Sequence, residues 1–117
     1  VRSPSAGAAL AELATEEGPG FRLVLAHRPE VVYELPLSGA ADLVVAGHTH
    51  GGQISVPGFG PLVTLTSVPR HVAAGGLHEV DGTAIFVSTG VGMERGQAPP
   101  VRLFVNPTVG LVELVPG

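Results

Sequence analysis

The stretch Gly47-His48-Thr49-His50-Gly51-Gly52-Gln53 directly follows the apolar run Asp42-Leu43-Val44-Val45-Ala46, and the interpretation of the whole chain depends on it. In an extended backbone, residues i and i+2 point to the same face about 6.6 Å apart, so we expect His48 and His50 to project into one space. Imidazole is the commonest metal ligand among side chains, and the glycines of this stretch let the backbone turn sharply beside a ligand. The pattern therefore indicates a metal site. The alternative is a polar loop after a buried strand, with solvated histidines.

Composition restricts the classes of protein to which this chain can belong. Its 117 residues are 44% hydrophobic, which indicates one globular domain or part of one. The formal net charge of −4, with 6 basic against 10 acidic residues, offers no basic patch to nucleic acid. Cysteine is absent, which excludes disulfides and thiolate zinc sites. No apolar run approaches the roughly 18 residues of a membrane span. The first residue is Val1 rather than Met, so we expect a fragment.

Upstream of the motif the sequence predicts a helix and then a strand. Ser3 is a suitable N-cap for a helix beginning at Pro4, and Gly18-Pro19-Gly20 ends that helix. Residues 21–26 are mostly apolar, which is typical of a strand buried on both faces. This strand delivers His27 at its carboxyl end.

The segment between His27 and the motif is long enough for a crossover connection. Residues 29–35 are expected to form a short helix, with Glu30 in the first turn, where the helix dipole favours an acid. The strands before His27 and before His48 are therefore predicted to be parallel neighbours. Parallel strands place their carboxyl ends at one edge of the sheet, where open α/β sheets bind ligands. We accordingly expect His27 to converge with His48 and His50.

The second half of the chain is expected to be mostly antiparallel β-structure. Asp81-Gly82 is a strong two-residue hairpin signal. Residues 56–61 are expected to form a loop, because Pro57 and Pro61 exclude a central strand there. The strands predicted after the motif are residues 63–66, 77–80, 83–88, 101–105 and 111–115.

These residues resemble a known family. Three segments carry the resemblance, namely Ala26-His27-Arg28-Pro29-Glu30, the run from Ala41 to Gln53 with its Gly-His-Thr-His motif, and Ile85-Phe86-Val87-Ser88-Thr89-Gly90-Val91-Gly92. They look like the C-terminal half of a calcineurin-like metallophosphoesterase, and the Gly-Gly-Gln extension is similar to the bacterial branch that includes membrane-associated phosphohydrolases. The resemblance implies an α/β fold, half of a four-layer sandwich, with parallel strands joined by a crossover helix and followed by antiparallel hairpins. Residues 1–117 would then be the C-terminal part of a single domain.

The resemblance also implies how the histidines are used. By motif, His27 and His48 would ligate one metal ion and His50 a second, so the complete domain would hold two divalent ions, Mn, Fe or Zn. The implied activity is hydrolysis of a phosphomonoester or phosphodiester, in a phosphorylated small molecule or lipid, by a metal-bound hydroxide. The family's Asp-x-His, Gly-Asp-x-x-Asp and Gly-Asn-His-Asp/Glu motifs are absent, so an N-terminal half is the expected partner. The intact protein would be cytoplasmic or membrane-associated.

The carboxylates of the chain lead to a similar expectation without the family. Two metal ions about 3.5–4 Å apart require anionic bridging ligands. The aspartates are Asp42, at the amino end of the strand that carries His48, and Asp81, in a hairpin turn. Glu30 and Glu94 are expected to be structural. Three histidines without a carboxylate leave open a mononuclear zinc site. A non-catalytic metal-binding or interaction module is the alternative to an enzyme.

Several other residues are candidates for contact with the metal ligands or the substrate: Gln53, Gly47, Arg28 and His71. Gln53 could orient a histidine ligand, and Arg28 could pair with phosphate oxygens. His71, expected in a loop, would contact phosphate or solvent. Arg102 is a further cationic candidate for substrate oxygens, but for both arginines a salt bridge or a snorkelling side chain is the more common role. His78 is expected to be a solvent-facing strand residue.

Overall fold

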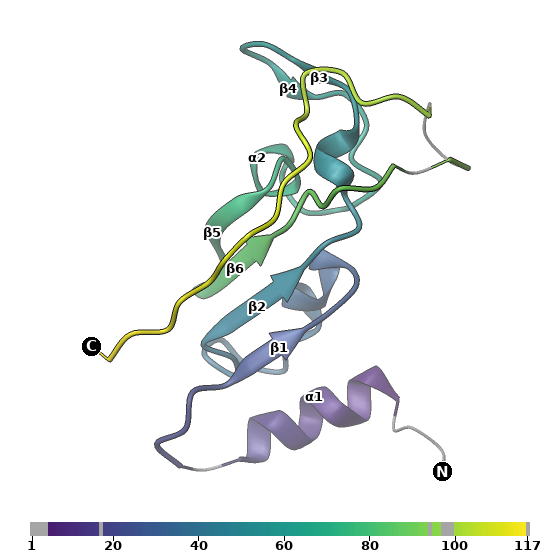
Figure 1. Cartoon of the computed structure of the whole chain (residues 1–117). Coiled ribbons are helices and arrows are strands. Elements are labelled where there is room, and N and C mark those ends of the chain that lie inside the picture. Colours follow the sequence, from purple (N-terminus) through teal and green to yellow (C-terminus); the bar gives the residue numbers. More distant parts are fainter. Residues whose placement is uncertain (1–4, 17, 94, 97–99, 117) are drawn as a thin grey trace.

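The computed structural model describes residues 5–16, 18–93, 95, 96 and 100–116, and it contains a four-stranded mixed sheet (Figure 1). The strands are β1 (Leu23–Leu25), β2 (Leu43–Ala46), β5 (Gly76–Val80) and β6 (Thr83–Val87). Their order across the sheet is β1-β2-β6-β5. Strands β1, β2 and β6 are mutually parallel, and β5 is antiparallel to β6. This arrangement confirms the predicted α/β fold class.

β1 and β2 are joined by the crossover that the sequence predicts. The connecting helix η1 (Pro29–Glu34) begins at its proline, whose fixed φ suits the first helical position, and it is a 3₁₀-helix. Leu23 pairs with Leu43 in parallel register. The two strands therefore end at the same edge of the sheet, immediately before the segments that carry His27 and His48.

The hydrophobic core lies on one face of this sheet, against η1 and the short helix α2 (Arg70–Ala73). Val44 and Ile85 are neighbours in register at the centre of the sheet, and both are completely buried. Val32 of η1 and Val72 of α2 belong to the same cluster. Because burial of apolar surface is the main favourable term in folding, this face fixes where the strand ends lie.

The opposite face of the sheet is apolar but largely open. Leu25, Val45, Phe86 and Leu77 form one row across the four strands, and Leu25 and Leu77 are 73% and 67% exposed. The prediction that the first strand is buried on both faces is therefore wrong, because β1 is an edge strand with one uncovered face. The C-terminal segment runs along this region, where Gly110 lies against the Phe86 ring (Figure 1).

Helix α1 (Ala6–Thr15) lies beyond β1, on the side away from β2 (Figure 1). Its N-cap is Ser5, whose hydroxyl accepts a hydrogen bond from the Ala8 N–H at 3.3 Å. The predicted cap, Ser3-Pro4, lies outside the described residues. No helix within the described ranges is long and apolar enough to cross a membrane.

β5 and β6 form the predicted hairpin around Asp81-Gly82. Both turn residues are left-handed, with φ of 49° and 76°, as a two-residue hairpin requires. The segment before β5 differs from the prediction. His71 lies in α2 and not in a loop, because Pro69 is followed by a single helical turn.

Between the motif and α2 the predicted strand at residues 63–66 is wrong. Leu65 is left-handed, with φ of 50°, and the Thr66 hydroxyl accepts from the Val68 N–H at 3.4 Å, so this segment bends. The predicted loop at 56–61 contains the ends of a small ribbon, β3 (Ser55–Val56) and β4 (Gly60–Pro61), which is separate from the main sheet.

The two strands predicted near the C-terminus are also wrong. Within 101–105 only Leu103 forms a bridge, to Ile54, and Phe104 then turns the chain with φ of 56°. Residues 111–115 have no strand partner in the part of the chain that the structure describes. An extended segment without a neighbouring strand cannot form the ladder that defines a sheet.

Candidate metal centre

His27 and His48 lie together at the carboxyl edge of the parallel strands. Their ring centroids are 4.7 Å apart, with an interplanar angle of 58°. The Gly47 N–H donates to the His27 carbonyl at 3.3 Å, which extends the pairing of the two strands past their last residues. The ladder that aligns β1 with β2 therefore also brings the two imidazoles together.

The backbone through the motif is not extended. His48 and His50 have φ of 69° and 49°, and Gly51 is left-handed as well. The short helix η2 (His50–Gly52) follows, with the Thr49 hydroxyl accepting from the Gly51 N–H at 3.3 Å. The expectation that alternation along a strand aligns the two histidines is therefore wrong, since the chain turns at each of them.

Two of the motif glycines are required by space and backbone conformation. A Cβ on Gly51 would lie 2.7 Å from Cγ1 of Val105, and one on Gly52 would lie 2.7 Å from the Val63 carbonyl oxygen. Both glycines have positive φ. Gly47 differs, because its φ is not left-handed and a Cβ there would meet only a backbone oxygen 3.8 Å away.

His50 stands apart from the His27–His48 pair. No three His, Cys, Asp or Glu side chains among the described residues lie close enough together to hold a metal ion. The Nδ1 atom of His50 is buried and has no hydrogen-bond partner within the described part of the chain. A buried nitrogen left unpaired is unfavourable. The unpaired Nδ1 is therefore consistent with a metal ligand or a hydrogen-bond partner from outside the described part of the chain.

Arg28 contacts His48 directly, with Nη2 of the arginine 3.3 Å from Nε2 of the histidine. Because a guanidinium only donates, this Nε2 is the acceptor, and the proton of the neutral ring is on Nδ1. Burial, followed by the positive charge of Arg28, lowers the pKa of His48 below its ordinary value of 6.5. The ring is therefore neutral at pH 7, the state that binds metals.

The Glu30 carboxylate accepts a hydrogen bond from the loop before α2. Its Oε1 accepts from the Ser67 N–H at 3.1 Å. Burial acts to raise the pKa of Glu30, but hydrogen bonds from Thr66 and Ser67 and the charge of Arg28 together outweigh it and lower that pKa. Its Oε1 anchors this loop, whereas Oε2 is buried and has no hydrogen-bond partner among the described residues, so a structural role for Glu30 stays a prediction.

The remaining acidic candidates do not approach the histidines. Asp42 accepts from the Arg22 N–H at 2.7 Å, at the amino end of β2. Asp81 occupies the hairpin turn. Glu94 lies outside the described residues.

A second pair of histidines, His71 and His78, lies on α2 and β5. Their ring centroids are 5.4 Å apart in an edge-on arrangement. Nε2 of His78 is 2.9 Å from the Gly75 carbonyl oxygen, so this ring is bonded to the backbone. His78 is also half-buried. The expectation that His78 faces solvent is thus only partly met, while His71 is exposed.

Gln53 is buried, with 2% of its surface exposed. Its N–H donates to the His50 carbonyl at 3.1 Å, and its own carbonyl accepts from the Leu103 N–H at 2.7 Å. Its backbone therefore fixes the end of η2 against the C-terminal segment. Contact between its side chain and a histidine ligand stays a prediction.

The roles of Thr49 and of the Arg102 side chain were not predicted from the sequence. Thr49 is 4% exposed and caps η2, and a hydroxyl residue two positions before a glycine is the signal of such a turn. Arg102 donates to the backbone carbonyl of Gly90, which precedes it in the sequence, and to that of Val105, which follows it. A local sequence pattern does not indicate bonds of that kind.

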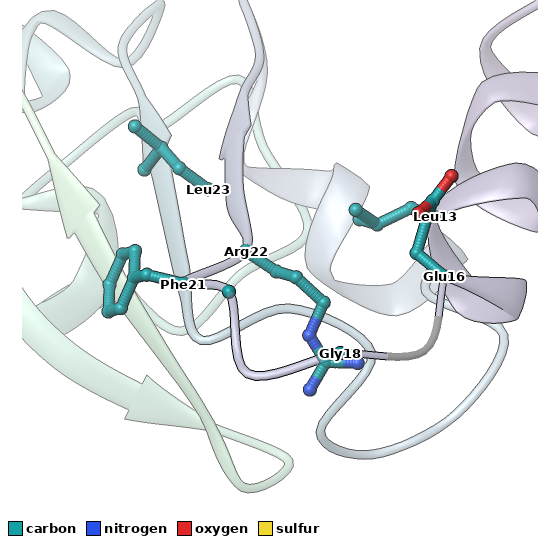
Figure 2. Close-up of a pocket in the computed structure, with 7 residues that line it drawn as sticks. Leu13, Glu16, Gly18, Phe21, Arg22 and Leu23 are labelled. Atoms are coloured by element: carbon teal, nitrogen blue, oxygen red, sulfur yellow. The ribbon is translucent and has the colours of Figure 1, made fainter.

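Two hollows border β1, and they differ in their relation to the histidines. The first, about 390 Å³, lies at the amino end of the strand and is shown in Figure 2, with lining residues Leu13, Glu16, Gly18, Gly20, Phe21, Arg22 and Leu23. It contains no histidine. The second, about 450 Å³, lies between α1 and β1, is mainly apolar and reaches His27.

Curated proteins similar to this chain are bacterial metallophosphoesterases. The uncharacterized metallophosphoesterase YkuE of Bacillus subtilis is 32% identical over 96 residues, which are 80% of this chain and 31% of that protein. The phosphodiesterase YaeI of Escherichia coli is 40% identical over 97 residues, 80% of this chain and 32% of that protein. An uncharacterized metallophosphoesterase of Helicobacter pylori is 36% identical over 95 residues, 80% of this chain and 23% of that protein.

This chain belongs to the calcineurin-like metallophosphoesterase superfamily. It spans about a third or less of the length of these curated relatives. No family model and no solved structure matches it.

Proposed function

We propose that this chain provides the histidine ligands of a dinuclear metal centre in a bacterial metal-dependent phosphohydrolase. The observation that carries the proposal is the contact between the His27 and His48 rings at the carboxyl edge of the sheet. His27 and His48 hold one divalent ion, Mn, Fe or Zn, and His50 contributes to a second. When bound, the metals supply Lewis acidity for hydrolysis of a phosphomonoester or phosphodiester.

The donor atoms of this chain fit part of such a centre. Neutral imidazoles suit Zn, Fe and other divalent ions, and the buried, unpaired Nδ1 of His50 supports a ligand at that ring. No carboxylate among the described residues joins the histidines in a group of three. We infer that the anionic ligands come from an N-terminal part of the same domain, of which residues 1–117 form the C-terminal part.

The open face of the sheet supports this division of the domain. Parallel sheets are normally covered on both faces, yet here Leu25 and Leu77 are 73% and 67% exposed in a row completed by Val45 and Phe86. The curated relatives are much longer than this chain, since the matched residues make up only 23–32% of their length. In the complete domain, a second sheet would cover this row.

Arg28 is proposed to act on both a metal ligand and a substrate. Its guanidinium donates to Nε2 of His48 at 3.3 Å, so a metal at that nitrogen requires the arginine to move away. The released donors would then be free to bind phosphate oxygens bidentately. Arg28 thus adds to the effect of burial in keeping His48 neutral in the metal-free chain, and it binds the phosphate of a small-molecule or lipid substrate in the loaded one. The apolar hollow that reaches His27 supports an apolar group on that substrate.

The test uses the longer protein that contains this chain. Its metal content is measured, and its turnover of an aryl phosphate and a bis-aryl phosphodiester is compared with that of the 117-residue chain alone. We expect about two metals per molecule and metal-dependent turnover in the longer protein, and no turnover above a metal-ion blank in the chain alone. His48→Ala in the longer protein should abolish turnover, while His78→Ala should leave it nearly intact.

The result decides between the enzyme and the alternative. A longer protein that binds metal at these histidines but hydrolyses neither ester would support a non-catalytic metal-binding module. A longer protein whose activity is indifferent to His48→Ala would contradict the proposed metal centre.

A further inference from the structure

We propose that Arg102 is a positioning residue for His50, because it joins the loop after β6 to the C-terminal segment and holds both against the backbone beside that histidine. The inference rests on the proposed function in one respect, namely that His50 is a ligand. The contacts that carry it are all between atoms of this chain, so they can be tested without metal or substrate.

The guanidinium of Arg102 is fully occupied by main-chain oxygens. A guanidinium carries five N–H donors. Nε donates to Val105, Nη1 to Gly90 and Gly92, and Nη2 to Thr89 and Asn106, at distances of 2.6–3.4 Å. Contact of Arg102 with substrate oxygens stays a prediction, and it would require the side chain to give up these bonds.

The carbonyls that Arg102 binds come from two segments that meet at η2. Thr89 follows β6, and Val105 belongs to the C-terminal segment. A Cβ on Gly51 would lie 3.1 Å from Cγ2 of Thr89 and 2.7 Å from Cγ1 of Val105. Arg102 donates to both of these residues. It thereby holds together the two side chains that enclose the residue directly after His50.

The same side chain also reaches the ring of His50 through Gly92. The shortest of its hydrogen bonds, at 2.6 Å, goes to the Gly92 carbonyl. A Cβ on Gly92 would lie 3.7 Å from Cε1 of His50, so the loop passes beside the imidazole. Fixing this loop limits the rotation of the ring, whose Nδ1 is buried and lacks a hydrogen-bond partner among the described residues.

The C-terminal segment is attached to the motif next to Arg102. The Leu103 N–H donates to the Gln53 carbonyl at 2.7 Å, and the Ser55 N–H donates to the Leu103 carbonyl at 3.0 Å. The backbone of Arg102 therefore belongs to a segment that is bonded to the residues after η2, and its side chain extends to the loop after β6. Lysine cannot replace it, because an ammonium is a point donor with three N–H groups and lacks the planar fork.

The experiment is an NMR comparison of the metal-free 117-residue chain with its Arg102→Lys and Arg102→Ala variants. Arg22→Ala is the matched control, since it removes an arginine paired with Asp42 at the opposite end of the strands. The ring resonances of His50 and His78 and the exchange rates of the backbone amides are followed. His78 serves as a reference ring on β5, because it is bonded to the Gly75 carbonyl and makes no hydrogen bond to Arg102.

In both Arg102 variants we expect the His50 ring signals to shift or broaden. The amides of Leu103 and Thr108, which bond to Gln53 and Gly90, should exchange about tenfold faster or more. The β5–β6 amides and the His78 ring should match the parent chain. In Arg22→Ala the His50 ring and the Leu103 and Thr108 amides should also match the parent.

Two results would overturn the proposal. The first is an unchanged His50 ring and unchanged exchange in both Arg102 variants. The second is equal acceleration of the β5–β6 amides, which would make Arg102 a residue for global stability and not for His50. Neither readout involves metal, so a failure of the proposed metal centre would leave this result intact and would be recognised separately.

Discussion

The chain contains two pairs of touching histidine rings, and they differ in what surrounds them. His27 and His48 have centroids 4.7 Å apart at the carboxyl edge of two parallel strands, beside an arginine. His71 and His78 have centroids 5.4 Å apart on α2 and β5, where one ring is bonded to a backbone carbonyl. Contact between imidazoles is therefore not what distinguishes a candidate site. The difference lies in strand topology, which places the first pair at the carboxyl edge of two parallel strands, beside the guanidinium of Arg28.

The largest expected effect is the loss of metal affinity on replacing His48. In calorimetric titrations of the 117-residue chain with Zn²⁺ or Mn²⁺, we expect loose binding of at most about one equivalent, because no carboxylate among the described residues joins the histidines in a group of three. His48→Ala should weaken this binding by about 100-fold or more, since even partners behind a ligand contribute 10–100-fold. Two tightly bound metals in the parent chain would contradict the ligand assignment.

The next effect concerns the backbone of η2, which carries His50. Gly52→Ala should lower the free energy of unfolding by about 2–4 kcal/mol, because its φ is positive and a Cβ would contact Pro61 and lie 2.7 Å from the Val63 oxygen. The matched control is Gly47→Ala, which has room for a Cβ and should stay within about 1 kcal/mol. Urea unfolding measures both. Equal losses in the two variants would contradict the packing described for η2.

A smaller effect is the pH response of the first pair. Burial and the charge of Arg28 lower the pKa of His48, so the folded chain binds fewer protons than the unfolded chain just below the ordinary value of 6.5. This contribution to stability is present above that value and is lost as pH falls toward the lowered pKa. Metal binding should weaken over the same lower range, because protons compete for the ring.

Arg28→Gln should move the pKa of His48 part of the way back, since burial is the larger cause and remains. An NMR titration of the ring measures this shift. A pKa of His48 that is the same in the variant and the parent would mean that the 3.3 Å contact with Arg28 has no electrostatic effect on the ring.

The smallest effect is expected from the second pair. His78→Ala removes one bond to the Gly75 carbonyl from a half-buried ring, so it should cost about 1 kcal/mol of stability. It should leave metal affinity unchanged in the same titrations. A fall in affinity comparable to that of His48→Ala would place a metal at His71 and His78 instead.

The parts of this structure that could be predicted from sequence are those set by local pattern. The apolar runs before His27 and His48, the proline at the start of η1 and Asp81-Gly82 each indicated an element that the structure contains. From these, parallel pairing of β1 and β2 followed, and with it the contact of His27 with His48.

The features that could not be predicted depend on tertiary contacts. Apolar composition at residues 111–115 favours a strand, but a strand also needs a neighbour to pair with. The left-handed conformation of His48 and His50 is set by the packing of η2, and alternation in sequence does not reveal it. The bonds of Arg102 link segments whose proximity only the fold determines.

The most direct test of the central assignment is paramagnetic broadening by Mn²⁺ in the unmodified chain. Trace Mn²⁺ is added at pH 7, and the ring signals of all five histidines are followed by NMR. We predict that the signals of His27 and His48 disappear first, while those of His71 and His78 persist. Earlier loss of the His71 and His78 signals, or equal broadening of all five rings, would contradict a metal centre at the carboxyl edge of β1 and β2.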